Sequence, residues 1–345
     1  MERYKHGGDI YAHRHPVLDF SANVNPLGYP PGLKETLIEN LDSFQRYPDA
    51  HCRELRKAIA DHHNITSDQV LCGNGAADLI YRICAYFRST KALITAPTFS
   101  EYERAVYVYG GQVSEYLLKE ENHFDVDESI VDTITDDIRL VFLCTPNNPT
   151  GRIIPLPLLE DIAKRCQQVR AFLVLDECFI DFTSFESMIS LMDRYPNLLI
   201  LRAFTKMYAM AGLRLGYMLS ANKELLDAIA TFGATWSVSG PAQAAGLVAL
   251  KAKDWTNKTR IYIQKERSFM AEKLQALGPK VFPGEANYLL LKYNRPLYQP
   301  LLEKGILVRD CGNYTGLSSL FIRIGIQTRE KNLKLLAAFK EALYG

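Results

Sequence analysis

The chain has 345 residues; 40 are lysine or arginine and 39 are aspartate or glutamate, so its formal net charge is +1. A near-neutral chain lacks the positive surface that a long polyanion requires, which argues against nucleic acid as the main ligand but leaves room for a small anion bound by a local charge cluster. Hydrophobic residues make up 48% of the chain and charged residues 23%, as in an ordinary globular protein. The length predicts two domains.

Cysteine usage and the start of the chain indicate the compartment. The seven cysteines are scattered and form no C-x-x-C pair, which argues against a disulfide framework or a zinc ribbon and favours reduced thiols. The start MERYKHGGDIY lacks the apolar core of a signal peptide, and no apolar run is long enough to span a membrane. The histidines have no convincing ligand spacing. We therefore expect a cytoplasmic protein that binds neither a membrane nor a metal.

From about residue 70, short apolar runs alternate with amphipathic segments. The expected strands are residues 70–72, 92–95, 139–144, 172–175, 198–202 and 215–219. Helices are expected after the first and third strands, where apolar residues recur on one helical face. Apolar runs that are buried on both faces and separated by helices predict an α/β fold with a mostly parallel, doubly wound sheet.

The two ends of the chain differ from this middle part. The first forty residues are rich in Pro, Gly and Asn and are expected to form an N-terminal arm and part of the small domain. A long helical region is expected from residue 242 to about 277, followed by short strands and a C-terminal helix, which predicts a smaller α+β domain. The predicted division is 1–40 for the arm, 41–245 for the large domain and 246–345 for the small domain. The arm is expected to form part of the small domain.

Polar motifs follow several expected strands, at the sheet edge where open α/β folds bind ligands. Gly75, Ala76 and Ala77 open a helix, where small residues let a phosphate approach the N–H groups, although most such turns are only tight turns. Asn148 lies in the turn P-N-N-P-T-G. Asp176 ends an apolar run, where a buried carboxylate is unfavourable unless it meets a cation or a hydrogen-bond donor. Asp176 could therefore bind a ligand, cap a helix or form a structural ion pair.

A lysine and an arginine follow the strand expected at residues 198–202. Lys206 lies between apolar stretches, and Arg214 comes eight residues later. A lysine near another cation in a dry site has a lowered pKa and can form a Schiff base, whereas the common alternative is a surface lysine. The guanidinium of Arg214 suits a phosphate.

Four motifs in order, G-N-G-A, P-N-N-P-T-G, D-E-C-F and T-K-x-x-x-x-x-G-L-R, resemble the fold-type I pyridoxal-phosphate enzymes of the class I/II aminotransferase family. The resemblance covers nearly the whole chain. It implies that pyridoxal 5′-phosphate is the cofactor, that Lys206 binds it as a Schiff base, and that Asp176 pairs with its pyridinium nitrogen so that the ring acts as an electron sink. It also implies that Asn148 donates to the ring 3′-oxygen and that Phe99 stacks on the ring, where the alternative for Phe99 is a core residue.

The same resemblance implies how the cofactor phosphate is held. The implied groups are Gly75, the amides of Ala76 and Ala77, Thr205 and Arg214. Tyr47 matches a tyrosine that reaches the cofactor phosphate of the neighbouring subunit, which implies a homodimer with shared active sites. Two positions depart from the family pattern: Phe179 replaces a common Tyr, which leaves the 3′-oxygen to Asn148, and Ala203 replaces a common Ser, which removes one phosphate donor.

Within the family, the chain resembles the histidinol-phosphate aminotransferases and the threonine-phosphate decarboxylases of cobalamin biosynthesis. The arm segment H-G-G, the segment D-E-C-F-I-D-F and the segment V-R-D-C-G-N-Y favour the decarboxylases. This implies PLP-dependent decarboxylation of O-phospho-L-threonine to (R)-1-amino-2-propanol phosphate. A histidinol-phosphate aminotransferase or a related amino-acid aminotransferase is the alternative. A non-catalytic pyridoxal-phosphate-binding regulator is a third possibility, against which Lys206 and Asp176 count.

The decarboxylase resemblance implies a set of residues that contact this small phosphorylated amino acid. They are His6, the Gly7 amide, Asn23, Asn148, Arg309 and Arg323. Arg323 is implied to grip the α-carboxylate, because a guanidinium forms a two-pronged pair with a carboxylate. Without the resemblance, His6 fits a disordered tail and Arg309 a solvated strand end.

Overall fold

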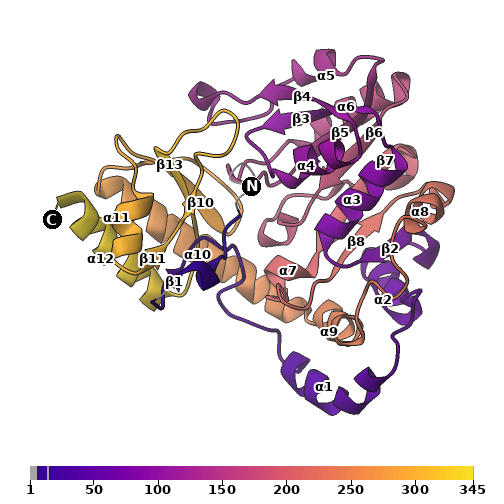
Figure 1. The fold of residues 1–345 in the computed structure, drawn as a ribbon, viewed down its shortest axis with the longest axis horizontal. Helices are drawn as coiled ribbons and strands as arrows, with labels where there is room; N and C mark the ends of the chain where they lie inside the picture. Colours follow the sequence, from indigo (N-terminus) through magenta and orange to yellow (C-terminus); the bar gives the residue numbers. More distant parts are fainter. Residues whose placement is uncertain (1–5, 14, 345) are drawn as a thin grey trace.

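The computed structural model describes residues 6–13 and 15–344. Its larger part is built on a seven-stranded sheet, coloured from indigo to pink in Figure 1. The strands are β2 (Val70–Gly73), β3 (Lys91–Ala96), β4 (Gln112–Leu117), β5 (Ile138–Cys144), β6 (Phe172–Asp176), β7 (Leu198–Ala203) and β8 (Gly216–Leu219). Their order is β2-β8-β7-β6-β5-β3-β4, and every pair is parallel except those of β8 with β2 and β7. The predicted α/β fold with a mostly parallel sheet is confirmed.

Helices cover both faces of this sheet, which explains its continuous apolar runs. The helices of the larger part are α2 (Arg53–His63), α3 (Ala76–Tyr86), α4 (Glu101–Val108), α5 (Ile130–Thr133), α6 (Leu156–Gln168), α7 (Phe204–Met207), α8 (Lys223–Ala230) and α9 (Gly240–Lys251). In β5, Leu140 and Phe142 belong to the core that contains residues of α3, α4 and α8, whereas Val141 and Leu143 belong to the core that contains residues of α6. Successive side chains of a strand point to opposite faces, so both sets must be apolar.

The smaller part is an α+β unit, also as predicted. Its elements are α10 (Lys253–Ala276), β9 (Lys280–Val281), β10 (Tyr288–Lys292), α11 (Tyr298–Glu303), β11 (Ile306–Leu307), β12 (Arg309–Asp310), β13 (Phe321–Gly325) and α12 (Arg329–Tyr344). Four of its strands form an antiparallel sheet in the order β12-β13-β10-β9. Among the described residues, no helix is both long and apolar enough to cross a membrane.

The N-terminal arm is attached to the smaller part. Its strand β1 (Leu18–Asp19) pairs in parallel with β11, and the Phe20 carbonyl accepts a hydrogen bond from Gly325 at 2.7 Å. Its helix α1 (Leu33–Glu39) packs on α9 and projects from the body of the molecule (Figure 1). This arrangement supports an arm that joins the small domain, although the predicted domain boundaries stay a prediction.

One strand was not expected, and one predicted helical region is divided in two. Strand β4 was not predicted, because it lies at the edge of the sheet, pairs only with β3, and carries polar residues where a central strand would be apolar. The helical region predicted from residue 242 to about 277 is confirmed, and it consists of two helices, α9 and α10, because the chain breaks at Ala252, whose φ of −86° and ψ of 50° are not helical. No glycine or proline marks this break in the sequence.

Gly216 in β8 lies directly behind the loop that opens α3. A Cβ at this position would lie 2.5 Å from the Ala76 nitrogen and 2.8 Å from the Gly75 carbonyl carbon. Backbone atoms cannot turn aside as side chains can, so we expect Gly216→Ala to lower the free energy of unfolding by about 1–3 kcal/mol. Gly212→Ala is the matched control, because in the described chain nothing lies within 4 Å of its Cβ. Denaturant unfolding of both variants tests this, and equal stabilities would contradict it.

Candidate active site

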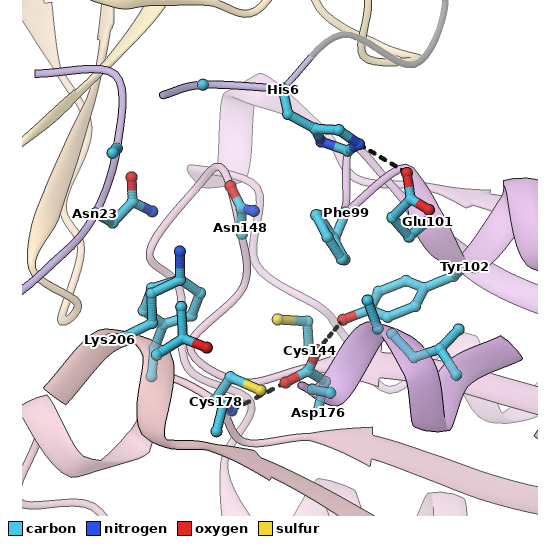
Figure 2. Close-up of a pocket in the computed structure, with 18 of the residues that line it drawn as sticks. His6, Asn23, Phe99, Glu101, Tyr102, Cys144, Asn148, Asp176, Cys178 and Lys206 are labelled. Atoms are coloured by element: carbon cyan, nitrogen blue, oxygen red, sulfur yellow. Dashed lines mark hydrogen bonds and ion pairs between the residues drawn. The ribbon is translucent and has the colours of Figure 1, made fainter. Parts of the chain in front are cut away.

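A cavity of about 500 Å³ lies at the carboxyl ends of the parallel strands, between the two parts of the chain. Most of the predicted site residues line it. They are His6, Gly7, Asn23, Ala76, Ala77, Phe99, Asn148, Asp176, Thr205, Lys206, Arg214, Arg309 and Arg323. Residues more than 300 positions apart in the sequence are therefore brought to one cavity, whose central part is drawn in Figure 2.

Lys206 lies in the short helix α7, immediately after β7, so the end of that strand delivers its amine to the cavity (Figure 2). Its Nζ lies 5.7 Å from the centroid of the Phe179 ring. Burial, together with the positive charges of Arg323 and Arg214, lowers the pKa of Lys206 to about 8. An amine with this pKa is available as a nucleophile or a base near neutral pH.

Asp176 ends β6 and is buried in the floor of the cavity. One of its carboxylate oxygens accepts a hydrogen bond from the Tyr102 hydroxyl at 2.6 Å, and the other accepts from the Cys178 N–H at 2.9 Å (Figure 2). The two donors fix the plane of the carboxylate. Sequence reasoning missed Tyr102: a buried tyrosine needs an acceptor, but nothing in the local pattern identifies Asp176 as that acceptor.

The start of α3 and the guanidinium of Arg214 lie against each other beside the cavity. Gly75 precedes the helix with a φ of +82°, and a Cβ there would lie 2.5 Å from Nη2 of Arg214. Glycine is therefore required for the guanidinium to lie against the start of the helix. The first N–H groups of a helix have no partner within it, and both they and a guanidinium bind anions. The residues of this site are Gly75, Ala76, Ala77, Thr205 and Arg214.

Arg323 reaches the cavity from β13 in the small sheet. One Nη donates to the Oδ1 of Asn148, and the other donates to the Ser21 carbonyl at 2.7 Å. Its Nε and the Oδ1 of Asn23 are buried without a hydrogen-bond partner among the described residues. A buried polar atom without a hydrogen-bond partner raises the free energy of the folded protein, so a ligand that forms a hydrogen bond with it gains affinity.

The N-terminal arm closes over the cavity. The His6 ring nitrogen Nε2 lies 2.7 Å from the Oε1 of Glu101 (Figure 2). The other carboxylate oxygen, Oε2, accepts from the Tyr81 hydroxyl at 2.9 Å. Burial raises the pKa of Glu101, but the hydrogen bonds from His6 and Tyr81 outweigh it and hold this pKa below its ordinary value. A Cβ on Gly7 would lie 2.2 Å from the Ser21 carbonyl oxygen, so glycine is required for this close approach.

Positive charge predominates around the cavity. In β12, Arg309 donates to the Asn313 side chain at 2.7 Å, and its guanidinium lies 4.9 Å from the Tyr314 ring centroid. Among the described residues, the cationic side chains that line the cavity are Arg104, Lys206, Arg214, Arg309 and Arg323, and the carboxylates are Glu101 and Asp176. This excess suits a ligand or ligands with several negative charges. Sequence reasoning missed Glu101 and Arg104, which lie in no motif.

Two predicted site residues do not line the cavity: Gly75, which lies next to Ala76, and Tyr47. Tyr47 is 80% exposed and stacks on Trp236, with ring centroids 4.5 Å apart. Its contact with a neighbouring subunit stays a prediction.

Known proteins resemble this chain along most of its length. The chain matches the family Aminotransferase class I and II over residues 15–339. It is 39% identical over 334 residues to threonine-phosphate decarboxylase of Salmonella typhimurium, covering 95% of this chain and 92% of that protein. It is 31% identical over 343 residues to histidinol-phosphate aminotransferase of Methanosphaera stadtmanae, covering 94% and 90%.

Solved structures share the fold along almost the whole chain. The L-threonine-O-3-phosphate decarboxylase from Porphyromonas gingivalis has a TM-score of 0.84 at 27% identity and covers 94% of this chain and 99% of that one. A histidinol-phosphate aminotransferase from Sinorhizobium meliloti, solved in complex with pyridoxal-5′-phosphate, has a TM-score of 0.86 at 21% identity and covers 96% and 91%.

The environment of Lys206 leads to a titration experiment. Because the charge of Arg323 helps to lower the pKa of Lys206, we expect Arg323→Met to raise that pKa above the value of about 8 in the unmodified chain. NMR of ¹³C-methylated lysines in cofactor-free protein measures this, and Lys206→Arg identifies the resonance. Arg329→Met, in the small domain, is the control and should leave the pKa unchanged. A pKa that stays the same or falls in Arg323→Met would contradict the assignment.

Proposed function

The chain belongs to the class I and II aminotransferase family, and within this family we propose that it is a threonine-phosphate decarboxylase. The proposed reaction converts O-phospho-L-threonine to (R)-1-amino-2-propanol phosphate and CO2, a step of cobalamin biosynthesis in the proteins that it resembles. The observation that carries the proposal is the closure of the arm, which brings His6 and Gly7 to the same cavity as Arg309 and Arg323. The identity of 39% with the decarboxylase of Salmonella typhimurium supports it.

The cofactor is pyridoxal 5′-phosphate, as predicted, and the site residues fit it. Arg214 lies against the start of α3, so its guanidinium and the first N–H groups of the helix can both donate to the cofactor phosphate. We assign Lys206 to covalent attachment, Asp176 to the ring nitrogen, Asn148 to the 3′-oxygen and Phe99 to the ring face. When bound, the cofactor supplies a sink for the electron pair that is released as a bond at the substrate Cα breaks.

The substrate has two anionic ends, and the cavity offers donors for both. We assign Arg323 to the α-carboxylate, because its Nε is buried and has no hydrogen-bond partner among the described residues. We assign His6, the Gly7 amide, Asn23 and Arg309 to the phosphate ester, since a phosphate dianion needs several donors. O-phospho-L-threonine would use both donor sets at once, whereas an aminotransferase would use them in turn, for histidinol phosphate and for the carboxylates of its 2-oxo acid.

Orientation of the substrate decides which bond breaks. In the proposed reaction, the residues that hold the carboxylate and the phosphate would orient the substrate so that the bond from Cα to the carboxylate breaks and the Cα proton is kept. Lys206, with its pKa lowered to about 8, is suited to hold at Nζ the proton that replaces CO2 at Cα. His6 and Gly7 of the arm line the same cavity, beside the residues that hold the substrate.

Histidinol-phosphate aminotransferase, or a related amino-acid aminotransferase, is the second candidate. The 31% identity with the Methanosphaera stadtmanae enzyme over 94% of this chain supports it. The cofactor site serves both reactions equally well, so the two candidates differ in the substrate-binding residues.

We further propose a homodimer in which Tyr47 reaches the cofactor phosphate of the neighbouring subunit. Tyr47 is exposed, and so are the apolar residues Tyr29, Ile38 and Leu41 in and around the projecting helix α1 (Figure 1). A group of exposed apolar side chains is typical of a protein interface. All seven cysteines are free and buried, which supports the cytoplasm as the proposed location.

Product analysis separates the two candidate reactions. We expect the protein with bound cofactor to release CO2 from O-phospho-L-threonine and to form aminopropanol phosphate without any 2-oxo acid. Lys206→Ala is the control and should form no product. Strict dependence on 2-oxoglutarate, with glutamate as a product from histidinol phosphate, would instead establish the aminotransferase.

Removal of a substrate-binding arginine should affect the substrate and spare the cofactor. We expect Arg309→Ala to raise the KM for O-phospho-L-threonine roughly tenfold to a hundredfold, because it removes charged hydrogen bonds to the phosphate. The visible absorbance of the bound cofactor should not change. Lys206→Ala, in contrast, should lose that absorbance. If Arg309→Ala also loses it, the assignment of Arg309 to the substrate is wrong.

A further inference from the structure

A buried guanidinium lies behind the loop that opens α3. Arg82 is 5% exposed and donates to both carboxylate oxygens of Asp78, from Nε at 3.1 Å and from Nη2 at 2.7 Å. The same Asp78 carboxylate accepts the backbone N–H of Asn74 at 2.8 Å. Asp78 therefore ties the loop before Gly75 to the first turn of the helix, and Arg82 holds Asp78 in place.

The same guanidinium makes a second contact, with the segment that joins α8 to α9. Its Nη2 donates to the Ser237 hydroxyl at 2.8 Å. A Cβ on Gly233 would lie 2.0 Å from the Arg82 Cζ, so this segment packs directly against the guanidinium. Trp236, next to Ser237, has a φ of +58°, which is unfavourable for a bulky residue and persists only where its surroundings hold it.

This segment also holds Tyr47. The Trp236 indole stacks on the Tyr47 ring at 4.5 Å. Gln243 adds a second connection, because its Nε2 donates to the Asp49 carbonyl at 2.9 Å and to the Val238 carbonyl at 3.0 Å. The backbone beside Tyr47 and the backbone beside Trp236 are thus held together by two independent contacts.

We propose that Arg82 is a positioning residue that couples the phosphate site of one subunit to the Tyr47 that the same subunit presents to its partner. The inference rests on the proposed homodimer. Arg82 and Ser237 do not line the cavity, so they act only through Asp78 and through the Trp236–Tyr47 pair. Because one guanidinium orders both features, a phosphate bound at α3 in one subunit stabilises the position of Tyr47 for the other. Because such coupling is reciprocal, cofactor bound in either subunit increases the affinity of the other subunit for the cofactor.

The test is the equilibrium dissociation constant of pyridoxal 5′-phosphate, measured on the full-length protein by titration. This readout does not depend on which reaction the protein catalyses. Ser237→Ala removes only the contact with the Trp236 segment and should weaken binding roughly twofold to tenfold. Arg82→Met removes both contacts and should weaken binding roughly tenfold or more, whereas Arg82→Lys keeps the charge and should recover part of the affinity. Ser237→Ala retains the buried ion pair, so it tests the coupling even where Arg82→Met does not fold.

A double-mutant cycle shows whether the effect passes through Tyr47. In the Tyr47→Phe background, we expect Ser237→Ala to cause no further loss of affinity. If Tyr47→Phe weakens binding while Ser237→Ala alone does not, the coupling is overturned and the proposed dimer stands. If Tyr47→Phe leaves binding unchanged, the shared site is overturned together with the coupling.

Arg329→Met controls for a general loss of stability. Arg329 forms a two-pronged pair with the buried Glu266, at 2.8–3.0 Å, in the small domain, although the Arg329 side chain itself is 42% exposed. We expect this variant to keep the affinity of the unmodified protein for the cofactor. Equal weakening in Arg329→Met and Arg82→Met would mean that stability alone is responsible, and would overturn the inference.

Discussion

An amine buried beside two guanidinium groups is the constraint on which the rest of the site depends. The chain places Lys206 at the end of β7, in a cavity that Arg214 and Arg323 also line. Burial and these two charges lower the pKa of the amine to about 8, which makes it reactive near neutral pH. The same guanidinium groups can bind anions. The same two guanidinium groups therefore lower the pKa of the lysine and can bind the anionic groups of the ligands.

The sheet makes this arrangement possible. Strands β5, β6 and β7 are parallel neighbours, so their carboxyl ends meet at one edge and bring Asn148, Asp176 and Lys206 together. The small sheet then supplies Arg309 and Arg323 from the other side, and the arm covers the opening. A chain with a net charge of only +1 thereby concentrates positive charge at one place. The net charge of a chain therefore helps to predict whether it binds a long polyanion, but it does not predict whether it binds a small anion.

The sequence predicted the parts of the molecule that local patterns determine. Strands buried on both faces leave continuous apolar runs, and the motif residues follow those strands, so the parallel sheet and most of the cavity lining could be predicted. Edge strand β4 could not, since an edge strand tolerates polar residues. Glu101, Tyr102 and Arg104 were missed because nothing in the sequence of α4 indicates that it faces the cavity. The role of Arg82 depends on contacts with a segment about 150 positions away, which no local pattern reveals.

The fate of the hydrogen atoms at Cα tests the central claim most directly. When O-phospho-L-threonine reacts in D2O, the account predicts an aminopropanol phosphate that keeps the original Cα hydrogen and gains one deuterium in the place of the carboxylate. Mass spectrometry and proton NMR of the product measure both. Loss of the original Cα hydrogen, with the amine converted to a carbonyl group, would contradict decarboxylation and establish transamination.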